Sequence, residues 1–258
     1  MNDPDLLALA GALAQRASGI ILEIRARGFE TLAKSDLSPV TEADHAAEAA
    51  ILEGLRGNTT IPVIAEEEIA AGLTTAPGEC FWLVDPLDGT REFAAGRDNF
   101  TVNIGLVRGG RAVLGAVALP AFRQLYLGRV GFGATRTDAD GTRPIAVRTA
   151  PAEGLTVLAS RHYAGDPALR AYLGAQRIAT LGNIGSAAKF VRVAEGAADL
   201  YPRLGRTMEW DTAAPQAVVE AAGGTVTLFD GSPLTYGKPG WENPHFVCRG
   251  HLFARVTS

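Results

Sequence analysis

Two short apolar segments end directly in acidic residues, and this pattern constrains the fold more than any other feature of the sequence. Val63–Ala65 is followed at once by Glu66, and residues 81–84 are followed at once by Asp85. Apolar runs of this length are typical of buried strands. Acids that directly follow a strand project from the edge of a sheet, into the crevice where α/β proteins place their ligands. The sequence therefore predicts carboxylates gathered at one edge of a sheet.

Helical and strand-like patterns divide the chain into two parts. Residues 5–27 carry apolar side chains at helical spacing, and Thr41 is placed to cap a second helix that extends to about Arg56. We expect short apolar strands at residues 63–65 and 81–84 and a meander of antiparallel strands with Gly-rich turns from residue 100 to residue 127. Strands and helices alternate from residue 155 to residue 228. This alternation is typical of a layered α/β half.

A polar stretch rich in Gly and Thr, at residues 133–150, is the expected seam between the two parts. We predict an N-terminal α+β subdomain over residues 1–145, with most of the candidate metal ligands. A C-terminal α/β subdomain over residues 146–258 would then recognise the substrate. The predicted fold class is α/β (α+β).

Composition limits the partners and the location of the 258-residue chain. The formal net charge is −4 and no dense stripe of Lys or Arg is present, which argues against a nucleic-acid polymer as a partner. The N-terminus is acidic, unlike a secretory signal, and no apolar run approaches the roughly 20 residues that span a bilayer. Cys80 and Cys248 lie in strand-like apolar stretches, as buried thiols in a reducing compartment do. We expect a cytoplasmic protein with no membrane partner, either a monomer or a homodimer.

A second acid follows Asp85 after three residues, in the segment Asp85-Pro86-Leu87-Asp88-Gly89-Thr90. The Pro restricts one backbone dihedral and the Gly permits an unusual one, so the carboxylates of Asp85 and Asp88 can face one point. Hard oxygen ligands arranged in this way suit Mg²⁺, and the chain has no cluster of His and Cys that would suit zinc. The segment therefore predicts a magnesium site.

Two further features accompany this segment. Gly89 and Thr90 would open a helix whose free amides form an anion site, and Asp211 lies at the start of another helix, as a ligand from the far side. Each feature alone is more often structural. The segment from Asp85 to Gly89 would usually be a capped turn, Asp211 would usually be an N-cap, and the acidic run from Glu66 to Glu68 would usually be a solvated surface. Because all of them lie at the ends of predicted elements in one chain, we favour a metal-dependent active site.

These motifs resemble those of the inositol monophosphatase superfamily. Residues 82–90 resemble its metal-binding signature, and residues 210–214 resemble its second signature. Residues 65–67 and 40–44 match its two remaining motifs, in the family's order and approximate spacing. The resemblance implies a layered α-β-α-β-α fold with metals in the cleft between its halves.

Within the superfamily, the chain most resembles the CysQ-type 3'(2'),5'-bisphosphate nucleotidases. Residues 91–93 and 100–104 continue the metal signature much as that branch does, and residues 160–162 and 198–203 also resemble it. The implied reaction converts 3'-phosphoadenosine 5'-phosphate to AMP and phosphate, with the sulfated analogue as a second substrate. The resemblance also implies a role in sulfur metabolism, inhibition by Li⁺, and two or three Mg²⁺ ions as cofactors.

The resemblance assigns the metal ligands residue by residue. Glu66, Asp85 and the main-chain carbonyl of Leu87 would hold the first ion. Asp85, Asp88 and Asp211 would hold the second. An inactive metal-binding regulatory protein on the same scaffold would have lost a ligand, and none of the acids in the motifs is missing.

The remaining assignments concern the water and the substrate. Thr90, hydrogen-bonded to Asp44, would orient the attacking water, and the phosphate would lie on the amides of Gly89 and Thr90. The candidates for contacts with the nucleotide are Ser160, His162, Lys189 and Arg203. Alternatively, His162 is a surface loop residue and Lys189 a solvated helix residue. An inositol-phosphate or histidinol-phosphate phosphatase of the same superfamily remains the nearest alternative function.

Overall fold

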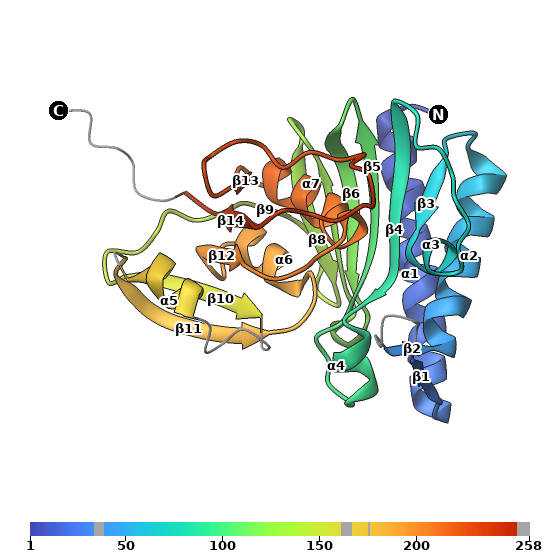
Figure 1. Cartoon of the computed structure of the whole chain (residues 1–258), viewed down its shortest axis with the longest axis horizontal. Coiled ribbons are helices and arrows are strands. Elements are labelled where there is room, and N and C mark those ends of the chain that lie inside the picture. Colours follow the sequence, from blue (N-terminus) through green and yellow to red (C-terminus); the bar gives the residue numbers. More distant parts are fainter. Residues whose placement is uncertain (34–38, 161–166, 175, 252–258) are drawn as a thin grey trace.

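Helices and sheets alternate as five layers in the computed structural model, which describes residues 1–33, 39–160, 167–174 and 176–251 (Figure 1). Helices α1 and α2 cover one face of a seven-stranded sheet. Helices α6 and α7 lie between that sheet and a five-stranded sheet, and α5 packs on the outer face of the second sheet. The predicted α-β-α-β-α order is confirmed. The helices of these layers are α1 (Asp3–Arg27), α2 (Glu42–Asn58), α5 (Pro167–Leu173), α6 (Ala188–Ala194) and α7 (Ala213–Ala221).

The seven-stranded sheet is almost entirely antiparallel. Its strands lie side by side in chain order, and β3 with β4 is its one parallel pair among the described residues. The predicted meander is therefore confirmed. The strands are β3 (Val63–Ala65), β4 (Cys80–Asp88), β5 (Thr101–Arg108), β6 (Arg111–Leu119), β7 (Gln124–Arg129), β8 (Gly133–Asp138) and β9 (Gly141–Ile145).

The last two of these strands correct one expectation. They form an antiparallel hairpin, so the prediction of a seam over residues 133–150 is wrong for most of its length. Every residue of β9 is exposed except Ile145, which is half-buried. Because an exposed strand needs no apolar face, the sequence of β9 lacks the alternation of apolar and polar residues that marks a half-buried strand. The division into residues 1–145 and 146–258 stays a prediction.

The five-stranded sheet is mixed, in the order β11-β10-β12-β14-β13. Strand β10 is parallel to β11 and β12, whereas β14 is antiparallel to β12 and β13. Both cysteines are free thiols in strands, Cys248 buried in β14 and Cys80 half-buried in β4. The strands of this sheet are β10 (Leu155–Ser160), β11 (Ile178–Ile184), β12 (Leu200–Arg203), β13 (Thr225–Leu228) and β14 (Phe246–Arg249).

Short elements connect these layers. Strands β1 and β2 pair antiparallel just before α2. Helix α2 begins after Thr41, whose hydroxyl accepts a hydrogen bond from the amide of Ala43 at 3.2 Å, which confirms the predicted cap. The short elements are β1 (Thr31–Ala33), β2 (Pro39–Thr41), α3 (Glu66–Ala70), α4 (Thr90–Ala94) and the 3₁₀ turns η1 (Pro120–Phe122) and η3 (Glu209–Asp211).

Helix α1 is long and apolar enough to cross a membrane by length and composition, contrary to the expectation that no run approaches such a length. In the structure it is the outer layer over the seven-stranded sheet, in contact with β5, β6, β7 and α2. Its inner face carries Ala10, Ala17 and Ile21, which are fully buried. The helix therefore packs against the sheet along one face and leaves its other face exposed.

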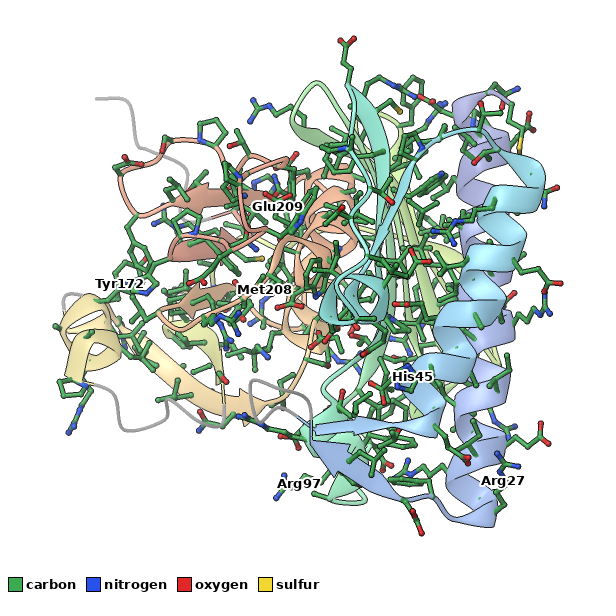
Figure 2. All side chains as sticks on the ribbon, turned by 45° about the vertical axis from the view of Figure 1, so that its right-hand side comes forward. Arg27, His45, Arg97, Tyr172, Met208 and Glu209 are labelled. Atoms are coloured by element: carbon green, nitrogen blue, oxygen red, sulfur yellow. The ribbon has the colours of Figure 1, made fainter. Side chains whose placement is uncertain are left out.

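Two glycines of the seven-stranded sheet let α7 approach it closely. A Cβ atom on Gly105 would lie 2.6 Å from the amide nitrogen of Ala214, and a Cβ atom on Gly115 would lie 2.2 Å from the carbonyl oxygen of Ala214. A larger residue at either position would therefore push the start of α7 away. The approach also brings η3, just before α7, into contact with β4. Figure 2 shows Glu209, the first residue of η3, and the preceding Met208 between the two sheets.

Candidate active site

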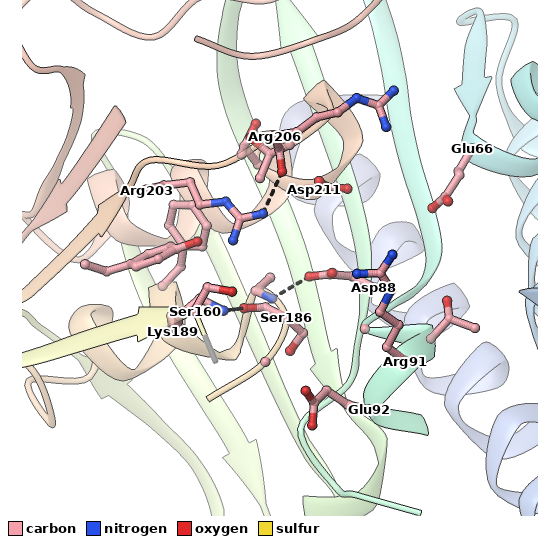
Figure 3. Close-up of a pocket in the computed structure, with 18 residues that line it drawn as sticks. Glu66, Asp88, Arg91, Glu92, Ser160, Ser186, Lys189, Arg203, Arg206 and Asp211 are labelled. Carbon is pink, nitrogen blue, oxygen red and sulfur yellow. Dashed lines mark hydrogen bonds between the residues drawn. The ribbon is translucent and has the colours of Figure 1, made fainter. Parts of the chain in front are cut away.

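A cavity of about 280 Å³ lies between the two halves of the molecule (Figure 3). Its walls come from the end of β4, the start of α3, the turn η3 and the segment before α6. In Figure 3, Lys189 and Arg203 lie on the side opposite Glu66, with Asp88 and Asp211 between them. The cavity therefore joins the predicted metal ligands to the predicted substrate contacts.

Three carboxylates meet at one side of this cavity, two of them, Asp88 and Asp211, lining it and the third, Asp85, buried beside them. Asp85, Asp88 and Asp211 each offer an oxygen atom, and these atoms all lie within 4.8 Å of one another. The pairing of β4 with β5 shifts register between Asp85 and Asp88, which lets both acids turn toward the same point although they are three residues apart. The amide of Leu87 donates to Asp85 Oδ1 at 3.0 Å and holds this turn.

The electrostatics of the cluster favour a cation. Burial raises the pKa of Asp211 to about 8, and the nearby charges of Asp88 and Glu66 add to the shift. Burial also raises the pKa of Asp88, although Lys189 opposes this. Carboxylates this close cannot all be ionised without a compensating positive charge. Since every donor in the cluster is a hard oxygen, the residues fit Mg²⁺.

Glu66 and Leu87 lie beside this cluster. Glu66 is the first residue of α3 and lines the cavity together with Asp88 and Asp211. The carbonyl oxygen of Leu87 lies 3.0 Å from Thr90 Oγ1, whose single hydrogen can be donated either to it or to Asp44 Oδ1, so at least one lone pair of the Leu87 oxygen remains for a metal. The two residues keep their predicted assignment as ligands of the first ion.

Thr90 and Asp44 are in direct hydrogen-bond contact. Thr90 Oγ1 donates to Asp44 Oδ1 at 3.0 Å. The other oxygen, Asp44 Oδ2, accepts from the amide of Thr41 at 2.8 Å and from its hydroxyl at 2.7 Å. Asp44 is buried, and its carboxylate is held by Thr41, the residue that also caps α2. The geometry is that expected of the predicted pair, whose role in proton transfer remains a prediction.

The backbone turns sharply where the phosphate is expected. Gly89 has φ of 92° and precedes α4, so the predicted helix opening at Gly89 and Thr90 is confirmed. A Cβ atom on Gly89 would lie 3.1 Å from the carbonyl oxygen of Asn99. A residue with a side chain would therefore be both strained and crowded here. Both Gly89 and Thr90 line the cavity beside Asp88.

Lys189 is one of the predicted substrate contacts, and it is buried, so the alternative of a solvated helix residue is wrong. Its ammonium group donates to the carbonyl oxygens of Ile184 at 3.1 Å and Ser186 at 2.6 Å. One of its three hydrogens therefore remains for a ligand. Burial lowers the pKa of Lys189 to about 7, against the opposing effect of Asp88.

The other predicted contacts divide into two groups. Ser160 and Arg203 line the cavity. One terminal nitrogen of the Arg203 guanidinium donates to the carbonyl oxygen of Arg206 at 2.6 Å. His162 lies outside the described residues, so its assignment stays a prediction.

Several cavity residues were not predicted. Ser186 lines the cavity in a left-handed backbone conformation, with φ of 52°. The next amide, of Ala187, donates to Asp88 Oδ2, so this turn ties the second half of the chain to the carboxylate cluster. Arg91 and Arg206 also line the cavity. Two of these residues could have been found because they lie close in the sequence to predicted site residues: Arg91 directly follows Thr90, and Ser186 precedes Lys189 by three residues.

Comparisons with known proteins agree with this geometry. The model of the inositol monophosphatase family matches residues 3–252 of the chain. The 3'(2'),5'-bisphosphate nucleotidase CysQ of Salmonella typhimurium LT2 is 41% identical over 238 residues, which cover 91% of this chain and 95% of that relative. Among solved structures, CysQ from Bacteroides thetaiotaomicron superposes with a TM-score of 0.78 at 30% identity, covering 96% of this chain and 97% of that one. An inositol monophosphatase from Anabaena superposes with a TM-score of 0.77 at 29% identity, covering 97% and 93%.

Proposed function

The chain belongs to the inositol monophosphatase family, and on that premise we propose that it is a Mg²⁺-dependent 3'(2'),5'-bisphosphate nucleotidase. Its substrate would be 3'-phosphoadenosine 5'-phosphate, which it converts to AMP and phosphate, and the sulfated analogue would be a second substrate. Relatives named CysQ, about as long as this chain and 40–41% identical to it, support the choice of substrate. The observation that carries the chemistry is the carboxylate cluster of Asp85, Asp88 and Asp211, of which Asp88 and Asp211 line the cavity.

The metal ligands follow from this cluster and its neighbours. Glu66, Asp85 and the Leu87 carbonyl would hold one Mg²⁺, and Asp85, Asp88 and Asp211 would hold a second. When bound there, the ions would supply positive charge to the phosphate and its leaving oxygen and would acidify water. Asp85 would belong to both sets, and its carboxylate lies close to those of Asp88 and Asp211.

Thr90 and Asp44 would handle the proton of the attacking water. A threonine hydroxyl has almost no basicity of its own, so it needs a carboxylate partner to act as a relay. In the relay, Thr90 would donate its single hydrogen to Asp44 Oδ1, which lies 3.0 Å away, and not to the carbonyl of Leu87. The lone pairs of Thr90 Oγ1 would then remain to accept a hydrogen bond from water. Proton transfer to Thr90 Oγ1 would then accompany transfer of the Thr90 proton to Asp44.

The second phosphate of the substrate would be read on the opposite side of the cavity. Arg203 lines the cavity, and a guanidinium fork matches the geometry of a phosphate. Lys189 would contribute charge through its remaining hydrogen, and Ser160 a hydroxyl at the cavity wall. His162 is the further candidate.

The biological setting belongs to the same proposal. We expect inhibition by Li⁺, a role in sulfur metabolism and a cytoplasmic location, with a monomer or a homodimer as the working form and neither a membrane nor a nucleic-acid polymer as a partner.

One assay tests the function. Phosphate release is measured with Mg²⁺ on 3'-phosphoadenosine 5'-phosphate, inositol phosphate, histidinol phosphate and fructose bisphosphate. We expect the highest kcat/KM on the bisphosphate nucleotide and loss of activity with a chelator. A higher kcat/KM on inositol or histidinol phosphate would overturn the assignment within the family, and activity that persists in the chelator would overturn the metal requirement.

A further inference from the structure

Glu48 of α2 caps the short helix that begins with Glu66. Its two carboxylate oxygens accept main-chain hydrogen bonds, Oε2 from the amide of Glu67 at 2.8 Å and Oε1 from the amide of Glu68 at 2.9 Å. Glu48 is 4% exposed, so these contacts are shielded from water. A buried carboxylate from one helix therefore replaces the solvent at the start of another.

Helix α3 lacks a cap of its own. It has five residues, Glu66–Ala70, and Ala65 at its N-cap position makes no side-chain hydrogen bond. The first amides of any helix have no acceptor within the helix, and a helix of this length is not stable by itself. The two hydrogen bonds from Glu48 supply the missing acceptors and fix the turn that begins with Glu66.

This arrangement is costly, which argues that it has a specific purpose. Burial raises the pKa of Glu48 to about 7, against the opposing effect of the Glu67 amide. A buried carboxylate is expensive unless it is hydrogen-bonded. An apolar residue would fill the same space without this penalty but would leave the amides of Glu67 and Glu68 without acceptors.

Helix α2 carries a second anchored carboxylate on the same face. Asp44 lies one helical turn before Glu48, at the i, i+4 spacing that places two side chains side by side. Asp44 accepts from Thr90, whereas Glu48 accepts from the amides that follow Glu66. One helix thus sets the positions of the predicted water-orienting residue and of a predicted metal ligand relative to each other.

We propose that Glu48 is a positioning residue for the first metal site: it holds the first turn of α3 so that the Glu66 carboxylate stays directed into the cavity. The inference rests on the proposed function, in which Glu66 is a ligand. Substitution of a residue that orients a metal ligand typically weakens metal affinity about 10- to 100-fold. Glu48 is not among the described residues that line the cavity, so its loss should affect metal affinity more than kcat at saturating Mg²⁺.

The test measures Mg²⁺ binding to the metal-free full chain by calorimetry, together with Tm without metal and kcat at saturating Mg²⁺. Glu48→Gln keeps the shape but loses one acceptor, and Glu48→Asp keeps the charge but shortens the reach. Glu66→Gln removes the proposed ligand. Glu53→Gln is the matched control, because Glu53 lies on the same helix with 70% of its side chain exposed and pairs with Arg16 on the surface.

We expect both Glu48 variants to raise the Kd for Mg²⁺ about 10- to 100-fold, with kcat at saturating metal near that of the wild type and no change in Glu53→Gln. An unchanged Kd in folded Glu48 variants, while Glu66→Gln binds weakly, would overturn this inference alone. An unchanged Kd in Glu66→Gln would overturn the metal assignment of the proposed function. Loss of the fold in both Glu48 variants would assign Glu48 to stability and overturn its positioning role.

Discussion

Replacing Thr90 or Asp44 tests whether the two residues act as one unit. Thr90→Val keeps the branched shape and removes the hydroxyl. Asp44 then retains its two hydrogen bonds from Thr41, so the fold loses about one hydrogen bond, or roughly 0.5–1.5 kcal/mol. In Asp44→Asn, the side-chain oxygen would stay with the Thr41 donors and the amide group would face Thr90, so the Thr90 hydroxyl could no longer pass its proton on.

Each variant should therefore lose turnover far more than stability. General acid–base catalysis contributes about 10²–10⁴-fold, which corresponds to about 3–5 kcal/mol in the barrier. We expect a loss of this size in kcat with KM nearly unchanged, measured by phosphate release at saturating Mg²⁺. Thr59→Val is the control, because Thr59 bonds only a carbonyl at the end of α2 among the described contacts and lies outside the residues that line the cavity.

The double variant decides between a unit and two separate effects. If Thr90 and Asp44 form one relay, the double variant should be little worse than the worse single variant. Losses that multiply would refute the relay, because each residue would then contribute on its own.

Three further predictions concern the metals and the substrate. Asp85→Asn should nearly abolish turnover and leave the circular dichroism spectrum unchanged; near-normal turnover would contradict a shared ligand. Burial and nearby acids raise the pKa of Asp211 to about 8, so below about pH 8 a bound metal must displace the Asp211 proton. Mg²⁺ affinity should therefore fall as the pH falls, and binding should release protons. Calorimetry in buffers of different ionisation enthalpy would contradict this if it detected no released protons. Arg203→Ala should weaken binding of 3'-phosphoadenosine 5'-phosphate by about 1.5–3 kcal/mol and change hydrolysis of a simple monoester much less, whereas equal losses in kcat/KM on both would assign Arg203 to the fold.

The sequence was most informative where function depends on residues close together in the chain. The spacing of Asp85 and Asp88, with Pro86 and Gly89 between and after them, predicts converging acids, and the structure brings them together. The layered fold was likewise predictable, because buried strands and amphipathic helices carry distinct patterns. These features are local, so a single sequence contains them.

Features that depend on tertiary contacts were not predictable in this way. The hairpin of β8 and β9 buries little apolar surface, so its residues look like a loop. Lys189 looked compatible with a solvated helix because its burial depends on the neighbouring elements. Glu48 gave no signal either, since its partners lie about 20 residues further along the chain in an element of five residues.

Competition between two substrates tests the central claim most directly. Equal concentrations of 3'-phosphoadenosine 5'-phosphate and inositol phosphate are incubated with the full chain and Mg²⁺, and the products are followed by chromatography. The account predicts that AMP forms first, while inositol phosphate remains almost intact until the bisphosphate is consumed. Release of inositol ahead of AMP, or no AMP at all, would contradict it.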